Sequence, residues 1–162
     1  MGEEQQLDPR VIPMQRIGAW IFSACLAAGS LIAAISAWTA SDRSMMALVG
    51  WGLLWISGNA ALAWHGQRWP AIEYRYTFYR IDDQGIEIRR GVYWRKVINV
   101  PRSRVQHTDV SQGPLERRFG LGTLVIYTAG TDHAKVTLAG LDHGVALRLR
   151  EQLMPERGPD AV

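Results

Sequence analysis

The chain has 162 residues, with 18 Lys or Arg against 15 Asp or Glu, a formal net charge of +3 and 48% hydrophobic residues. Its single cysteine, Cys25, excludes an intramolecular disulfide and a metal site built from several thiolates. From residue 68 onward the chain holds fifteen Lys or Arg against eleven Asp or Glu, so its basic character belongs to the C-terminal part.

Two uncharged apolar runs follow each other near the N-terminus, from Ile17 to Ser41 and from Ser44 to Gln67. Each exceeds the roughly 20 residues that an α-helix needs to cross a hydrocarbon core of about 30 Å. A cleaved signal peptide is disfavoured, because the first run is longer than an h-region of about 7–15 residues and acids precede it. We therefore predict two membrane spans in a helical hairpin, joined by Asp42 and Arg43.

The flanking charges predict the orientation of this hairpin. So short a linker makes the two helices antiparallel, which places both of their outer ends on one side of the bilayer. Basic residues gather on that side, namely Arg10, Arg16, Arg68, Arg75 and Arg80, against Arg43 alone in the loop. By the positive-inside rule we expect a multi-pass protein of the inner (plasma) membrane, with both termini and the C-terminal part in the cytoplasm.

Small residues recur at four-residue spacing along the first run, as at Ala24, Ala28 and Ser30, Ala34. Such stripes let helix backbones approach closely. They predict packing against the chain's own second span or against a helix of a partner.

From Glu73 onward the hydrophobic pattern changes from helical to alternating, which indicates short strands separated by turns. The predicted strands are Tyr74–Ile81, Gly85–Arg90, Tyr93–Val100, Arg104–Val110, Leu121–Ala129 and Lys135–Leu138. A helix follows, with Asp142 as its N-cap, Leu141 placed to pack on Ala146, and Pro155 at its end. Strands followed by one terminal helix indicate a small antiparallel sheet or barrel with the helix packed over one end.

The segment from Arg104 to Leu121, RVQHTDVSQGPLERRFGL, followed by Thr128-Ala129-Gly130, resembles the signature of the bacterial PH-domain membrane proteins of the YdbS-like group. In that group two N-terminal spans precede one PH-like domain, so the resemblance covers nearly the whole chain. It implies a pleckstrin-homology-type fold. The expected fold class is a transmembrane α-helical hairpin plus an α+β, mainly-β PH-like domain, a bent antiparallel sheet or barrel closed by a C-terminal helix. The expected parts are a cytoplasmic arm (1–16), the hairpin (17–67), the PH-like domain (68–154) and a tail (155–162).

One candidate partner-docking surface is the corner formed by Gln112, Gly113, Pro114, Leu115, Glu116 and Phe119. Gly113 permits positive φ and Pro114 fixes φ, so the pair breaks the preceding strand. We expect Leu115 and Phe119 to form a hydrophobic plug, Phe119 and Leu121 to re-enter the core, and Glu116 to pair with a nearby arginine such as Arg104. The same features suit a purely structural corner, and both interpretations stay open.

A second candidate surface, for anionic lipid or an acidic partner, is a basic run with two aromatic residues at its middle. It consists of Arg89, Arg90, Tyr93, Trp94, Arg95, Lys96, Arg102 and Arg104, with no acid between the first and the last. Each well-placed cation near anionic lipid is worth about 1 kcal/mol. Strand alternation would instead divide the run between two faces, where the cations simply solubilise the sheet.

The residue patterns of enzymes are missing from the sequence. His107 and Asp109 are two apart on a predicted strand and are expected to share a face with Val105. His133 and His143 have no spacing that shows convergence on a zinc site, and neighbouring serines do not make a triad. We predict structural hydrogen bonding for His107 and Asp109, and neither catalytic residues, metal nor cofactor.

These patterns predict a non-enzymatic, membrane-anchored PH-like interaction module that assembles with membrane protein partners on the cytoplasmic face. The resemblance suggests another PH-domain membrane protein as the partner, because related single-domain proteins occur beside larger multi-PH proteins. The main alternative is a sensor or binder of anionic lipid headgroups through the basic run, and an unrecognised enzyme ranks third. Membrane lipids are expected contacts, a homo-oligomer is compatible with the sequence, and nucleic acid is not expected because no recognition motif is present.

Overall fold

A computed structural model describes residues 4–40, 45–129 and 135–154. The chain divides into two compact units, one of Gln15–Ala71 and the other of Met1–Met14 together with Ile72–Val162. Four predicted features lie outside the described residues: the linker at Asp42 and Arg43, Gly130 at the end of the signature, the helix stop at Pro155, and the tail 155–162.

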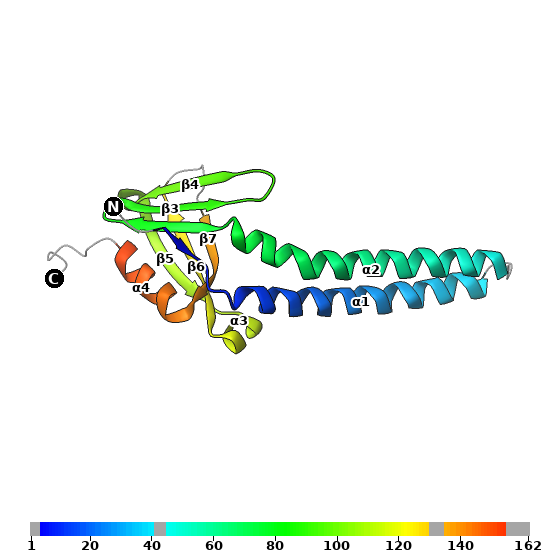
Figure 1. Cartoon of the computed structure of the whole chain (residues 1–162). Helices are drawn as coiled ribbons and strands as arrows, with labels where there is room; N and C mark the ends of the chain where they lie inside the picture. Colours follow the sequence, from blue (N-terminus) through cyan, green and yellow to red (C-terminus); the bar gives the residue numbers. More distant parts are fainter. Residues whose placement is uncertain (1–3, 41–44, 130–134, 155–162) are drawn as a thin grey trace. The chain divides into compact units, whose positions relative to one another are not determined.

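The first unit consists of two long helices, drawn in blue to green in Figure 1. Helix α1 runs from Val11 to Ala40 and helix α2 from Met45 to Arg75. Val11–Thr39 has a mean hydropathy of 1.9 and none of its most apolar stretch is buried. At about 1.5 Å per residue this helix is long enough to cross a hydrocarbon core of about 30 Å.

Only the first of the two predicted spans is confirmed as a candidate membrane helix. Within the described residues α1 alone is both long and apolar enough by composition. Helix α2 has 31 residues and is not among the candidate spans found in the described residues. It also continues through Pro70 to Arg75, eight residues beyond the predicted end of the second run at Gln67.

The two helices pack closely within their unit. The Trp55 indole Nε1–H donates to Ser30 Oγ at 2.8 Å, and Arg16 Nε donates to the Gln67 carbonyl at 3.1 Å. A Cβ at Gly66 would lie 2.8 Å from the Ala19 Cβ, so the backbones approach as closely as small residues permit. Of the four small residues named from the sequence, Ser30 contacts the second helix through Trp55, whereas Ala24, Ala28 and Ala34 are exposed.

The second unit begins with a four-stranded antiparallel sheet. Its strands are β1 (Gln5–Gln6), β2 (Phe78–Asp82), β3 (Gly85–Arg90) and β4 (Lys96–Pro101), in that spatial order. Gln5 pairs with Tyr79 and Gln6 with Phe78. The helical pair is therefore inserted between two neighbouring strands of one sheet, and the arm before α1 belongs to the domain that follows α2.

A three-stranded antiparallel sheet and a helix complete this unit (Figure 1). A 3₁₀ helix (Arg102–Arg104) leads into β5 (Val105–Ser111), then come α3 (Pro114–Phe119), β6 (Leu121–Thr128), β7 (Lys135–Asp142) and α4 (His143–Leu153). Helix α4 packs against all three strands. As predicted, Asp142 is its N-cap: the carboxylate accepts from Gly144 N at 2.9 Å and Val145 N at 3.3 Å.

Both sheets and α4 share one core. Its fully buried members come from every layer and include Ile86, Ile88, Leu124, Ile126, Leu141 and Leu153. Each such side chain contributes about 1.5–3 kcal/mol when it is removed from water. The order of strands and terminal helix agrees with the predicted PH-like domain.

Several predicted strand boundaries are wrong. The predicted first strand, Tyr74–Ile81, begins four residues too early because α2 extends to Arg75, and β2 begins at Phe78. The predicted Tyr93–Val100 strand is observed only from Lys96, since the preceding residues form the turn after β3. Strand β7 continues to Asp142 rather than ending at Leu138. Aromatic and basic residues satisfy helix, strand and turn patterns equally well over such short windows.

Candidate functional site

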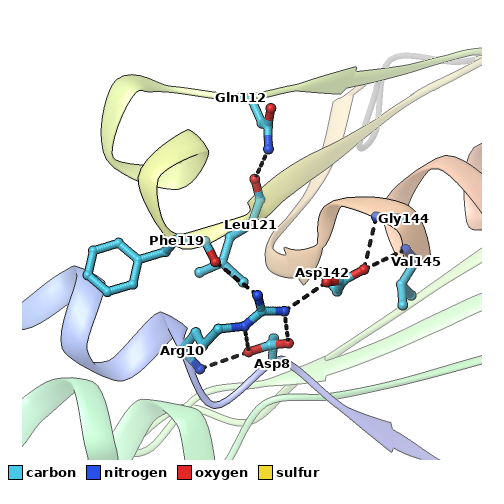
Figure 2. Close-up of polar contacts among 8 residues, drawn as sticks. All are labelled: Asp8, Arg10, Gln112, Phe119, Leu121, Asp142, Gly144 and Val145. Atoms are coloured by element: carbon cyan, nitrogen blue, oxygen red, sulfur yellow. Dashed lines mark hydrogen bonds and ion pairs between the residues drawn. The ribbon is translucent and has the colours of Figure 1, made fainter.

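The residue just before α1 lies at the centre of a polar network, shown in Figure 2. The Arg10 guanidinium donates to both carboxylate oxygens of Asp8, at 2.9 and 2.7 Å. Its Nη2 also donates to Asp142 Oδ2 at 2.7 Å, and its Nη1 donates to the Phe119 carbonyl at 3.1 Å. One side chain therefore joins the arm, the end of β7 and the end of α3.

The charges in this network support one another. The hydrogen bond from Arg10 holds the pKa of Asp8 below its ordinary value of 3.8, despite some burial. The same guanidinium lowers the pKa of Asp142, helped by the backbone amides at the start of α4. Asp8 first and Asp142 second raise the pKa of Arg10. All three groups are consequently charged at neutral pH.

Close backbone contacts attach the same arm to β7. Asp8 N donates to the Gly140 carbonyl at 2.9 Å, and Val11 is only 3% exposed. Gly140 has a φ of +82°, and a Cβ there would lie 2.7 Å from Val11 Cγ2. On the other sheet, Tyr79 Oη–H donates to Gln5 Oε1 at 2.8 Å. The arm thus packs as part of the folded domain.

The corner after β5 is held together by its own polar groups. Gln112 Nε2 donates to the Leu121 carbonyl at 2.6 Å. The two oxygens of Glu116 accept from Gly113 N at 2.7 Å and from the Thr123 hydroxyl at 2.5 Å. Because side chains and backbone satisfy each other, the corner is a rigid feature of the domain.

Two expectations for this corner are wrong. Among the described residues Glu116 pairs with Gly113 and Thr123 and not with Arg104, because its side chain turns back to cap the N-terminus of α3. Gly113 has an ordinary φ of −75°, while the left-handed residue is Gly120, at φ +67°, where α3 ends. The turn therefore requires a glycine for conformational reasons at Gly120 and not at Gly113.

The apolar residues of the corner are only half covered. Leu121 is fully buried as predicted, whereas Leu115 and Phe119 are half-buried, so the predicted insertion of Phe119 into the core is wrong. In Figure 2 the Phe119 ring points away from the Arg10 network. Arg117 and Arg118, which the sequence analysis did not single out, are exposed on the same short helix. The structure thus brings the six candidate docking residues together on one corner.

The basic run is divided into two groups. The first group, named here the hairpin tip, lies at the β3–β4 turn and consists of Arg90, Tyr93, Trp94, Arg95 and Lys96. Arg102 and Arg104 lie beyond the other end of β4, about 20 Å away at 3.3 Å per residue. Arg102 Nη2 donates to the Met154 carbonyl at 3.2 Å. Arg89, on the outer face of the sheet, forms ion pairs with Glu87 and Glu4.

His107 and Asp109 interact on the surface of β5. Their Nε2 and Oδ1 atoms are 2.8 Å apart, and the side chains are 60% and 52% exposed. The predicted common face with Val105 is wrong, because a β-bulge between Val105 and His107 turns Val105 into the core. Within the described residues no group of three His, Cys, Asp or Glu side chains is placed to hold a metal ion. His133 lies outside these residues.

Sequence comparison agrees with this architecture. The model of the family described as bacterial PH domain matches residues 17–157. The chain belongs to the bacterial PH domain family. That match includes most of α1, all of α2, the strands from β2 to β7 and α4, and it begins after β1.

One curated relative of the chain is the UPF0699 transmembrane protein YdbS of Bacillus subtilis (strain 168). It is 31% identical over 102 residues, which are 63% of this chain and 60% of the relative. The match thus spans less than two thirds of the relative's length. No solved structure gives a significant match to the chain. A bacterial PH domain in a chain similar to a transmembrane protein makes this a membrane-associated module.

Proposed function

We propose that the chain is a non-enzymatic, membrane-anchored interaction module, whose PH-like domain assembles with membrane protein partners on the cytoplasmic face. One observation carries this proposal: the domain contains chain from both sides of the helical pair. Strand β1 pairs with β2, and Arg10 joins Asp142 just before α1 begins. The domain is therefore fastened to its helices at two points.

This arrangement supports two membrane crossings. Residues before α1 and after α2 hydrogen-bond within one folded sheet, so both must lie on the same side of a bilayer. If α1 crosses the membrane, α2 has to bring the chain back. Asn59 in α2 donates from Nδ2 to the Trp55 carbonyl at 2.9 Å, which gives its amide donor a partner within the helix. The arginines that flank the pair favour the cytoplasmic side for the domain.

The placement of the titratable groups supports a non-enzymatic role. Asp142 caps α4 and binds Arg10, and Glu116 holds the corner before α3. His107 is engaged with Asp109 on an open strand surface. Each of these four carboxyl and imidazole groups thus has a structural contact.

The corner around α3 is the docking surface that we assign to a protein partner. Leu115 and Phe119 expose part of their apolar surface, and Arg117 and Arg118 stand beside them. An apolar centre with arginines at its rim is typical of protein interfaces. The family membership favours another PH-domain membrane protein, or a second copy of this chain, as the partner.

A site-specific photocrosslinker in cells tests this assignment. We would place the crosslinking residue at Leu115 and, as the matched control, at Asn99, an exposed position on β4. The proposal expects crosslinks from position 115 to one defined membrane protein and none from position 99. A Leu115→Asp variant that keeps its thermal unfolding midpoint should lose this partner. Identical crosslinks at both positions, or lipid adducts alone, would contradict the docking assignment.

Binding of anionic lipid headgroups remains a second candidate function. The observation that favours it is the exposure of the hairpin tip, which keeps cations and aromatic rings together after the run is divided. Headgroup attraction should fade as ionic strength rises, whereas a contact centred on Leu115 should persist.

A further inference from the structure

The hairpin tip exposes unusually large apolar side chains. Trp94 is 90% exposed and Tyr93 81% exposed, and Val97, one residue into β4, is 61% exposed. Aromatic residues of this size dominate the energetics of cores and interfaces. These two aromatic rings and Val97 lie within five residues at the end of the hairpin, so they mark a contact surface rather than scattered exposure.

The same tip is uniformly cationic. Arg90, Arg95 and Lys96 are exposed, and no acid occurs between Ile88 and Thr108. Within residues 4–40, 45–129 and 135–154, none of these three cations has an ion-pair partner. Arg89 differs, because Glu87 and Glu4 already neutralise it. The tip therefore presents positive charge that is free to bind an anion from outside the described domain.

Strand pairing places the tip at the end of the sheet where the chain enters β2. Phe78, the first residue of β2, pairs with Arg89, and the tip begins at the next residue of β3. The chain reaches Phe78 only three residues after Arg75, the end of α2. The opposite turn, at Asp83, lies at the far end of the same sheet.

We propose that the hairpin tip seats in the headgroup layer of an anionic bilayer. Trp94 and Tyr93 enter the interfacial zone, where indole and phenol rings are favoured. Arg90, Arg95 and Lys96 contact lipid phosphates. We assign the tip to the lipid surface rather than to a protein, because the proposed membrane anchor α1 keeps the domain beside a bilayer. An anionic bilayer also matches both the charge and the aromatic character of the tip. The inference deepens the second candidate function and rests on membrane anchorage, not on the docking corner.

Fluorescence of a label on the full-length protein tests the seating directly. In a Cys25→Ala background, an environment-sensitive nitrobenzoxadiazole dye is attached at Tyr93→Cys, which leaves Trp94 in place. The matched control carries the dye at Asp83→Cys, in the turn at the far end of the same sheet. Each protein is reconstituted alone into nanodiscs of phosphatidylcholine, or of phosphatidylcholine with phosphatidylglycerol, and measured at low and high salt.

We expect a blue shift of the dye at position 93 in the anionic nanodiscs, a smaller shift in phosphatidylcholine, and none at position 83. An Arg90→Gln/Arg95→Gln/Lys96→Gln variant should lose the anionic-lipid shift, whereas Arg102→Gln/Arg104→Gln should keep it. Thermal unfolding confirms that both variants are folded. Equal emission at positions 93 and 83 would overturn the proposal. A shift that is equal in the two lipid compositions and unchanged in the triple variant would also overturn it. No partner is present, so failure here leaves the docking corner unaffected, and failure of the crosslinking test leaves this result unaffected.

Discussion

Arg10 and Asp142 are 132 positions apart in the sequence, yet Arg10 Nη2 lies 2.7 Å from Asp142 Oδ2. The first residue of this pair immediately precedes α1, and the second caps α4. Because the same guanidinium also binds Asp8 and the Phe119 carbonyl, the start of α1 is tied to three parts of the PH-like domain. This ion-paired attachment is the basis for the first two predictions.

Replacing Arg10 by Gln should loosen the arm. The variant loses the charge-assisted hydrogen bonds to Asp8 and Asp142, so the thermal unfolding midpoint in detergent should fall. Amide hydrogen exchange at Gln5 and Gln6 should become faster, because these residues form β1 within the arm that Arg10 holds against the domain. Arg117→Gln is the matched control, since Arg117 is exposed on α3 and makes no ion pair within the described residues. Equal effects of the two changes would contradict a special role for Arg10.

Acid should weaken the same attachment. The pKa values of Asp8 and Asp142 are lowered in the folded state, so these carboxylates stabilise the fold above their ordinary value of 3.8. Their contribution is lost as the pH falls through the lowered folded values. The unfolding midpoint of the parent protein should therefore drop steeply below about pH 4. In Arg10→Gln the drop should be shallower, and an unchanged slope would argue that other groups cause it.

Two substitutions separate the cap of α4 from the ion pair. Asp142→Ala removes both and should cost at least about 1 kcal/mol, the typical value of a lost N-cap. Asp142→Asn keeps a capping oxygen for Gly144 N but removes the charge that Arg10 binds. Equilibrium unfolding should rank the parent above Asn and Asn above Ala. If Asn were as unstable as Ala, the charge and not the cap would dominate.

Gly140 should be intolerant of a side chain. Its φ of +82° is unfavourable for other residues by about 1–2 kcal/mol, and a new Cβ would overlap Val11. We expect Gly140→Ala to lower the unfolding free energy by more than this amount and to release the arm to hydrogen exchange. Gly113→Ala is the matched comparison, because its φ is −75° and the nearest atom to a new Cβ is 3.5 Å away. That variant should be close to neutral.

Glu116 should matter for stability more than an ordinary surface acid. Glu116→Ala leaves Gly113 N and the Thr123 hydroxyl without their acceptor, which should cost about 1–3 kcal/mol. Glu151→Ala, at a side chain that is 71% exposed, should change the unfolding free energy little. A neutral Glu116→Ala would show that the corner is held by Leu121 and the backbone alone.

Local patterns explain what the sequence could predict. Strand β3 was predicted with its observed bounds, and the cap of α4 at Asp142 was predicted correctly, because alternation and capping are written in consecutive residues. The domain boundaries at 16/17, 67/68 and 154/155 stay predictions. The signature from Arg104 to Leu121 predicted the fold family, which the comparisons confirm.

Contacts between distant residues explain what the sequence could not predict. Two glutamines in β1 carry no strand pattern, and no local signal connects Arg10 to Asp142 across the helical pair. The bulge at Val105 shifts the alternation by one residue, which places Val105 in the core while His107 and Asp109 stay on the surface. Strand alternation predicts that the basic run can be divided between faces. Only the register of β3 with β4 shows which cations stay beside Trp94.

Cysteine accessibility tests most directly the claim that one domain is fastened to both ends of a membrane-crossing helical pair. In a Cys25→Ala background, single cysteines at Gln6, Asp83 and Asp42 would be treated with a membrane-impermeant maleimide in vesicles of each orientation. Positions 6 and 83 should react only from the cytoplasmic face, and position 42 only from the opposite face. Reaction of position 42 from the same face as position 83 would contradict the account.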